Sequence, residues 1–175
     1  MPLPDPTLLN APLTALTALP GPAGTLADAL PAPGLRLMAS GGDLSLHWSS
    51  PRDRLLEVTS TVAAPADWLA LRLTLDLPDM TGLAGVGLWL RAAADPALTL
   101  RAVLRSGAGD GHRDAAQDRQ ILCHATASDH CALWLADATP DLPATAPWRE
   151  LLLFLPAYRP VTLSLHALRV FPVPA

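Results

Sequence analysis

The sequence predicts an all-β fold, an antiparallel two-sheet β-sandwich with an extended N-terminal arm. From Leu35 onward, hydrophobic and polar residues alternate with a period of two, which is the pattern of strands with one buried face. Clusters of Gly, Pro, Asp and Ser interrupt this alternation about every eight to twelve residues, a spacing typical of a sandwich or barrel. Residues 1–34 lack the alternation. The 175 residues therefore divide into an arm, residues 1–34, and one sandwich domain, residues 35–175.

The arm is rich in Pro, Ala and Leu and is too apolar for an ordinary disordered tail. We expect it to lie extended over its own domain or over a partner subunit, and a loose terminus is the alternative. It lacks the basic start and the continuous apolar core of a secretory signal, so we expect synthesis in the cytoplasm. The leucines that make the arm apolar are Leu3, Leu8, Leu9, Leu13, Leu16 and Leu19.

The clearest strand spans residues 68–77, where leucines at the odd positions alternate with Trp, Ala, Arg, Thr and Asp. A helix would spread these leucines around its circumference. The same reasoning predicts strands at residues 35–38, 44–48, 55–62, 86–90, 98–104, 120–127, 131–136, 150–155 and 161–170, and about ten strands fit two sheets.

One run of residues is apolar throughout, and three segments between the predicted strands are predicted loops. The run 151–155 is apolar at every position, so we expect that strand to be buried on both faces, by the arm or by another subunit. Segments 78–85, 107–118 and 137–147 are rich in Gly, Pro and Asp and are predicted loops, with one helical turn allowed within residues 110–119. No apolar run is long enough for a membrane span.

Charge argues against nucleic acid as a partner. The net charge is -4, and the 12 basic residues, all Arg, are scattered and form no basic patch. The two cysteines, Cys123 and Cys131, are too few for a disulfide framework. If residues 127–129 are the tip of a hairpin, the thiols share one face of paired strands. We interpret them as two buried core thiols, with a bridge or a metal site as the alternatives.

No motif for catalysis is evident. Glu57 and Glu150 are the only glutamates, and both lie in or beside predicted strands. Neither a G-x-S-x-G elbow nor an H-E-x-x-H helix occurs. The acidic loop of Asp110, Asp114 and Asp118 does not have the spacing of a calcium loop, and the histidines lack zinc spacing. We therefore expect no cofactor, no metal and no enzymatic activity.

The aromatic residues indicate a binding surface. Neighbouring residues of a strand point to opposite faces, so odd and even positions can be assigned to the core or to the outside. This parity places Trp48 on a core face but Trp68, Trp89 and Trp134 on outer faces, with Arg and His at neighbouring positions. A pyranose packs its C–H groups on an indole, while its hydroxyls need fixed donors and acceptors. The alternative is a protein–protein interface, where Trp and Arg are also enriched. The candidate ligand-binding residues are Trp89, Arg91, Arg101, Arg105, His124, His130 and Trp134.

Over residues 35–172, a strand at 98–106 is followed by a long Gly/Asp loop, and a strand at 161–171 closes the domain. This order of elements resembles that of galactose-binding-like, jelly-roll carbohydrate-binding modules. The resemblance implies a jelly-roll sandwich that binds a glycan and does not catalyse. A freestanding sandwich with an apolar arm is also similar to head spikes or fibres of phage-like particles, including gene transfer agents, which leave the cell by lysis.

The sequence thus favours a lectin-like module, a spike or fibre of a phage-like particle that attaches to cell-surface polysaccharide. Its partners would be that polysaccharide and, through the arm, other protein subunits of a homo- or hetero-oligomer. The alternative function is a purely structural assembly subunit whose Trp/Arg face is a protein–protein interface.

Overall fold

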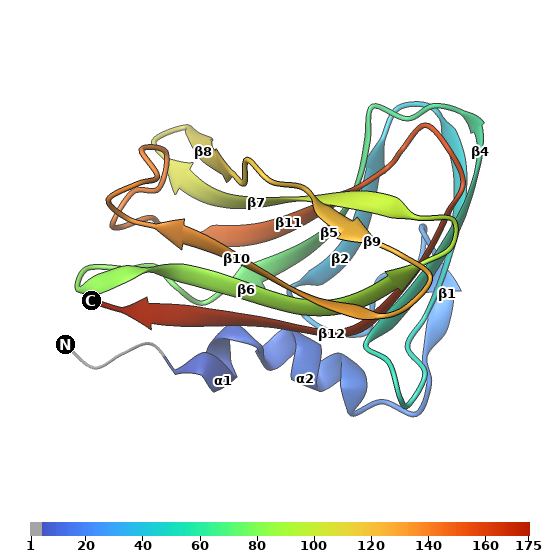
Figure 1. Ribbon diagram of the computed structural model, residues 1–175, viewed down its shortest axis with the longest axis horizontal. Coiled ribbons are helices and arrows are strands. Elements are labelled where there is room, and N and C mark those ends of the chain that lie inside the picture. Colours follow the sequence, from blue (N-terminus) through green and yellow to red (C-terminus); the bar gives the residue numbers. More distant parts are fainter. Residues whose placement is uncertain (1–4) are drawn as a thin grey trace.

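The computed structural model describes residues 5–175, so residues 1–4 of the predicted arm, including Leu3, lie outside the described residues. Two antiparallel sheets of six strands each face one another (Figure 1). The prediction of an all-β, antiparallel two-sheet sandwich is confirmed.

The two sheets draw their strands from all along the chain. Sheet A contains, in spatial order, β1 (Ala23–Thr25), β3 (Asp43–Ser49), β4 (Leu56–Ala64), β12 (Val161–Pro174), β6 (Leu83–Ala94) and β10 (Ser128–Leu135). Sheet B contains β2 (Leu35–Ser40), β5 (Trp68–Leu75), β11 (Arg149–Leu155), β7 (Leu98–Ala108) and β8 (Gly111–Ala116), and β9 (Ile121–Cys123) pairs with β7. Consecutive strands such as β6 and β7 therefore belong to different sheets.

Leucines of the central strands fill the space between the sheets. In β5, the odd-numbered leucines from Leu69 to Leu75 are at most 5% exposed, as the alternation predicts. Leu153 of β11 lies opposite Leu71 of β5 and Ala102 of β7, so inward positions line up across sheet B. Burying one such leucine contributes about 1.5–3 kcal/mol. The intervening positions of these strands form the outer face of the sheet.

The N-terminal segment is helical and not extended as predicted. Figure 1 shows α1 (Pro6–Leu9) and α2 (Ala11–Thr17) beneath β12 of sheet A. The Asp5 carboxylate caps α1 by accepting a hydrogen bond of 2.8 Å from the Thr7 N–H, and each helix has a proline in its first turn, where no N–H is needed. Leu9 of α1 and Leu13 and Leu16 of α2 are buried in the main core. The segment thus lies over its own domain. Within residues 5–175, no helix is long and apolar enough to cross a membrane.

Asn10 joins the helical segment to the edge of a strand. Its amide nitrogen donates to the Val170 carbonyl and its Oδ1 accepts from the Val170 N–H, both at 2.8 Å. β12 pairs with β4 only from Val161 to Leu165. At Val170 the amide of Asn10 therefore takes the place of a neighbouring strand.

The predicted arm also supplies β1, which pairs with β3 at the end of sheet A. Trp48 of β3 is 4% exposed, as predicted for a core residue, and its indole N–H donates to the Thr25 carbonyl at 3.0 Å. Residues 23–25 thus belong to the sandwich itself.

The region from residue 107 to residue 131 differs from its prediction. Residues 111–116 form β8, a polar edge strand, where a loop or a helical turn was expected. β9 pairs with β7, whereas β10 pairs with β6, so Cys123 and Cys131 lie in different sheets and not in one hairpin. Both are free thiols. Cys123 is buried as predicted, and burial raises its pKa to about 11; the prediction that Cys131 is buried is wrong, because it points out of sheet A.

Candidate functional site

The predicted ligand-binding residues do not share one surface. Trp89 and Arg91 lie on β6 at positions that alternate with buried core residues, so they face outward from sheet A. Arg101 and Arg105 occupy the equivalent outward positions of β7 in sheet B. Because β6 and β7 belong to different sheets, these pairs lie on opposite faces of the sandwich. The prediction of a single Trp/Arg face is wrong.

The prediction that Trp134 lies on an outer face is also wrong. Its side chain is 1% exposed, and its indole N–H donates to the Ala115 carbonyl of β8 at 2.7 Å. Leu133 and Leu135 face outward instead, at 46% and 38% exposed. β10 and β8 are the edge strands of the two sheets, so the large indole closes the gap between them while the aliphatic side chains remain outside.

The two predicted histidines are separated from both pairs. His124 is exposed and follows β9. His130 lies on β10 opposite Leu90, a core residue, and is therefore on the inner side of sheet A. Its Nε2 is 2.9 Å from the Ser128 hydroxyl. Neither histidine joins Trp89 or Arg101.

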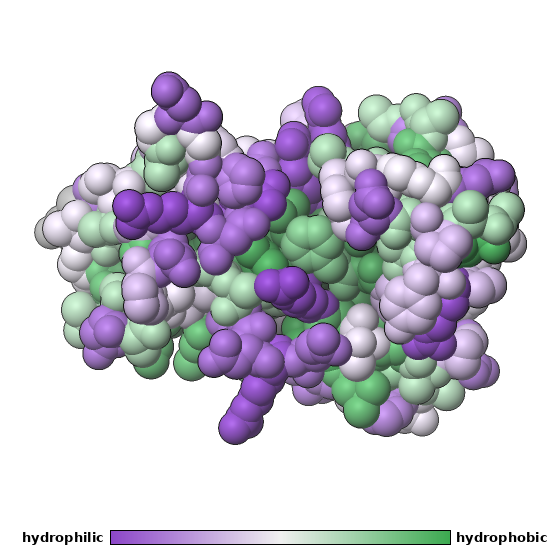
Figure 2. All heavy atoms as spheres, turned by 90° about the horizontal axis from the view of Figure 1, so that it is seen from above, coloured by the Kyte–Doolittle hydropathy of each residue, from purple (hydrophilic) through white to green (hydrophobic). Residues whose placement is uncertain are grey.

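The outer face of sheet B carries a second apolar layer outside the main core. Ala70, Val103 and Leu152 of β5, β7 and β11 are 2%, 2% and 5% exposed, yet they belong to no part of the core between the sheets. The half-buried Phe154 lies opposite Ala70, and Trp68 is the next outward residue of β5. Figure 2 shows this side of the molecule, with a hydrophobic strip recessed between hydrophilic side chains. We call this outer surface of β5, β11 and β7 the platform.

The burial of Leu152 refines the expectation for the apolar strand 151–155. Both sides of β11 are largely buried, as predicted. The helices of the arm, however, lie beneath β12 of sheet A (Figure 1) and reach sheet B only beside Thr74 and Trp148, so they do not cover this strand. Leu152 lies opposite Arg72 on one side and Val103 on the other, so its outward side chain stands between two neighbouring side chains of the platform.

Paired charges border the platform. Glu150, Arg105 and Asp114 lie in one row across β11, β7 and β8. Arg105 donates from Nε and from one terminal nitrogen to the two Asp114 oxygens, each at 2.7 Å. This bidentate bond lowers the pKa of Asp114 and raises the pKa of Arg105. Arg72 forms a second pair with Glu150 at 3.3 Å.

Arg101 differs from these arginines. It is exposed on β7 directly opposite Phe154 of β11, and it makes no hydrogen bond or ion pair with any described residue. The platform thus combines an aromatic ring, an unpaired guanidinium and fixed polar pairs. The sequence identified Arg101 and Arg105, whereas Phe154 was hidden in a run that is apolar at every position.

A buried arginine holds one end of the platform. Arg149, the first residue of β11, is 0% exposed. Its guanidinium donates to the Leu77 carbonyl at 2.7 Å, the Ser106 hydroxyl at 2.6 Å and the Pro143 carbonyl at 2.6 Å. Burial lowers the pKa of Arg149. These bonds tie the loop of residues 137–147 to the ends of β5 and β7.

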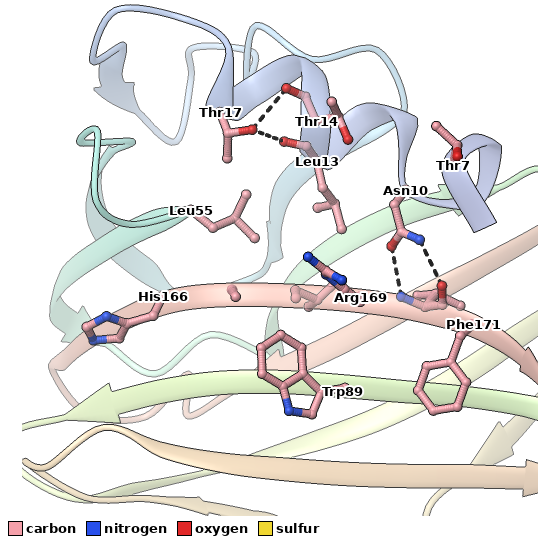
Figure 3. A pocket seen from close by; sticks show the side chains of 13 residues that line it. Thr7, Asn10, Leu13, Thr14, Thr17, Leu55, Trp89, His166, Arg169 and Phe171 are labelled. Atoms are coloured by element: carbon pink, nitrogen blue, oxygen red, sulfur yellow. Dashed lines mark hydrogen bonds between the residues drawn. The ribbon is translucent and has the colours of Figure 1, made fainter.

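A separate groove of about 850 Å³ lies between the helices and the outer face of sheet A (Figure 3). Trp89, Arg169 and Phe171 form its base, and α1 and α2 form its wall. Phe171 lies directly on the backbone of β6, because a Cβ at Gly87 would be only 2.1 Å from its ring. Trp89 is the one predicted ligand-binding residue in this groove.

Within residues 5–175, no group of three or more His, Cys, Asp and Glu side chains is arranged to hold a metal ion.

No protein-family model matches the chain, and no curated protein matches its sequence. Solved structures do share its fold. The xylan-binding domain CBM22-1 of Paenibacillus barcinonensis Xyn10C has a TM-score of 0.56 at 10% identity, over 88% of this chain and 94% of that one. The N-terminal cellulose-binding domain of Cellulomonas fimi β-1,4-glucanase C has a TM-score of 0.54 at 18% identity, over 86% and 94%.

A third similar structure is the enzymatically active domain of tailspike protein 4 of bacteriophage CBA120. Its TM-score is 0.51 at 13% identity, over 81% of this chain and 20% of that one. At these identities, all three likenesses show the fold alone.

Proposed function

We propose that this chain is a non-catalytic module that binds a neutral polysaccharide along the platform. The observation that carries the proposal is the apolar layer on the outside of sheet B, where Phe154 and the unpaired Arg101 lie opposite each other. Ala70, Val103 and Leu152 are at most 5% exposed, so the apolar area open to a ligand is that of the half-buried Phe154 and Trp68. Exposed apolar area with polar groups at its border is typical of a binding surface.

The chemistry of the platform fits a sugar chain. The C–H face of a pyranose packs on an aromatic ring such as Phe154. Its hydroxyls need both donors and acceptors held in place, and the ion pairs Arg105–Asp114 and Arg72–Glu150 provide both. Within these two pairs the charges neutralise one another, so the pairs add no net charge beside that of Arg101, and we expect neutral sugars to bind through their donors and acceptors.

The same pairs argue against catalysis at the platform. A general acid needs a carboxyl group whose pKa is raised toward the working pH. Arg105 instead lowers the pKa of Asp114. The similar structures named xylan-binding and cellulose-binding domains support the proposal, since they show that this fold is used to bind neutral polysaccharides.

Isothermal titration with soluble xylan and mixed-linkage β-glucan tests the proposal. We expect Phe154→Ala to weaken binding by about tenfold or more, and Arg101→Gln to weaken it less. Arg119→Gln, an exposed arginine on the loop before β9, is the matched control. If the folded chain binds neither polysaccharide nor any other neutral glycan of an array, the proposal is wrong.

Sedimentation velocity of the same variants separates this function from its alternative. An assembly interface on the platform would make Phe154→Ala change the mass in solution, whereas a glycan site would leave that mass unchanged.

We further propose that the module serves as an attachment spike or fibre of a phage-like particle, made in the cytoplasm and released by lysis. The fold shared with a phage tailspike domain supports this role. Mass spectrometry of particles purified from a lysate should find this chain in a fixed ratio to the capsid protein. Its absence from such particles would contradict the role and leave the glycan site untouched.

A further inference from the structure

The groove on sheet A carries a cation that the fold does not use. Arg169 of β12 lies directly opposite Trp89 of β6, and Figure 3 shows its guanidinium directed from the strand toward the helices. Arg169 is exposed and makes no hydrogen bond or ion pair with any described residue. Its guanidinium lines the groove and has no partner in the fold, so its donors are free to contact a ligand there.

The charge of the groove is one-sided. The described residues that line it include Arg169 and His166 but no carboxylate, although the whole chain has a net charge of -4. The nearest outward arginine of β6, Arg91, is already paired with Asp129 at 2.9 Å. The lining therefore favours a ligand with a negative charge.

The remaining surfaces of the groove fit a sugar ring. Trp89 is half-buried, so one part of its indole is open to the groove. The wall exposes threonines at positions 7 and 14, whereas the Thr17 hydroxyl is bonded to the Leu13 and Thr14 carbonyls and the Asn10 amide to β12. The volume of about 850 Å³ lies within the range of small-ligand sites.

We propose that the groove between α1–α2 and sheet A is a second saccharide site that binds an acidic sugar residue, with its ring on Trp89 and its carboxylate on Arg169. The planar guanidinium matches the two oxygens of a carboxylate, and the indole matches the C–H face of the ring. This site is independent of the platform, which lies on the opposite face of the sandwich.

Isothermal titration with a trimer of galacturonic acid and the matching neutral trimer of galactose tests the proposal. We expect the acidic trimer to bind at least about tenfold more tightly at low salt and to lose this preference as salt is added. Arg169→Gln should abolish the preference, and Arg169→Lys should restore only a fraction of it, because an ammonium group does not match both oxygens. Trp89→Ala should weaken both trimers.

Two controls locate the effect. Arg119→Gln removes the same charge elsewhere and should leave the preference unchanged. Phe154→Ala should also leave the preference unchanged, although it weakens binding at the platform. Equal affinity for both trimers, or an unchanged preference in Arg169→Gln, would overturn the second site. Binding of neutral polysaccharide that persists in Arg169→Gln would still support the platform, so the two proposals fail separately.

Discussion

The platform on sheet B and the groove on sheet A both place arginines beside aromatic rings, but they treat charge differently. On the platform, Arg105 and Arg72 are paired with Asp114 and Glu150, whereas the neighbouring Arg101 makes no such pair with a described residue. In the groove, Arg169 has no partner among the described residues. A paired arginine presents fixed donors next to fixed acceptors, whereas a lone arginine presents a net charge. Under the two proposals, arginines bind neutral hydroxyls on the face where carboxylates stand beside them, and an acidic sugar in the groove, whose described lining contains no carboxylate.

The largest expected effect concerns Arg149, which anchors only the platform side. In Arg149→Met, the Leu77 and Pro143 carbonyls and the Ser106 hydroxyl lose their donor inside the protein. We expect the free energy of unfolding to fall by about 3–5 kcal/mol in urea titration. Arg36→Met, at an exposed arginine of β2, should change it by less than about 0.5 kcal/mol. A similar small loss for both would mean that the guanidinium does not anchor the loop.

Two tryptophans that the sequence placed together should behave differently. Trp134→Ala leaves a cavity between the sheet edges and removes the bond to Ala115, so we expect a loss of about 3–4 kcal/mol in the unfolding free energy. Trp89→Ala alters a half-buried groove residue and should cost less than about 1 kcal/mol. If both variants lost the same unfolding free energy in thermal or urea unfolding, Trp89 would be a core residue and would not form the base of the groove.

Asn10→Ala tests whether the N-terminal helices contribute to the groove and not to the platform. Loss of both bonds to Val170 should lower the stability by about 1–3 kcal/mol and speed hydrogen exchange at Leu13 and Leu16. Binding of the acidic trimer should weaken, while binding of neutral polysaccharide at the platform should stay constant. A parallel loss at both sites would show that the two faces are coupled.

Glu150→Gln should make the platform resemble the groove. Arg72 loses its ion pair and Arg105 a neighbouring negative charge, so the platform gains net positive charge. Both variants are compared in an Arg169→Gln background, in which the groove no longer prefers the acidic trimer. There we expect Glu150→Gln to bind the acidic trimer about threefold to tenfold more tightly than the chain with Glu150 does. No gain in this background would mean that pairing does not set the charge preference.

The smallest effect is a pH dependence of the platform. Arg105 lowers the pKa of Asp114, so the pair contributes stability above the pKa of about 3.9 in the unfolded chain, and this contribution is lost as pH falls through the lower folded pKa. Both side chains are partly exposed, at 27% and 38%, so we expect about 0.5 kcal/mol. Urea midpoints at pH 7 and pH 3 should differ less in Asp114→Asn than in the native chain.

The sandwich could be predicted because its central strands have one face in the core. The leucines from Leu69 to Leu75 alternate so strictly that only a strand would bury them together. β8 was missed because an edge strand exposes most of its side chains, and its residues are accordingly polar. The helices were missed because the prolines indicated an extended arm. The spacing of Leu9, Leu13 and Leu16 was the signal for a buried helical face.

The sites could be predicted only in fragments. Trp89, Arg101 and Arg105 do face outward, as their parity indicates. Parity along one strand cannot, however, tell which sheet the next strand joins, and so the residues of β6 and β7 were combined into one surface. On β10 the parity itself was reversed, because the outward positions carry Leu133 and Leu135 and the inward positions include Trp134.

The contact between Asn10 and Val170 has a consequence for solubility. Beyond Leu165, β12 has no partner strand on its β4 side, so its backbone there could pair with a strand of another molecule. The N-terminal helices occupy that side, and the Asn10 amide uses both backbone groups of Val170. A chain shortened by its first nineteen residues would expose this edge together with Val170 and Phe171. The N-terminal segment therefore covers a strand edge that would otherwise be open to pairing with another molecule.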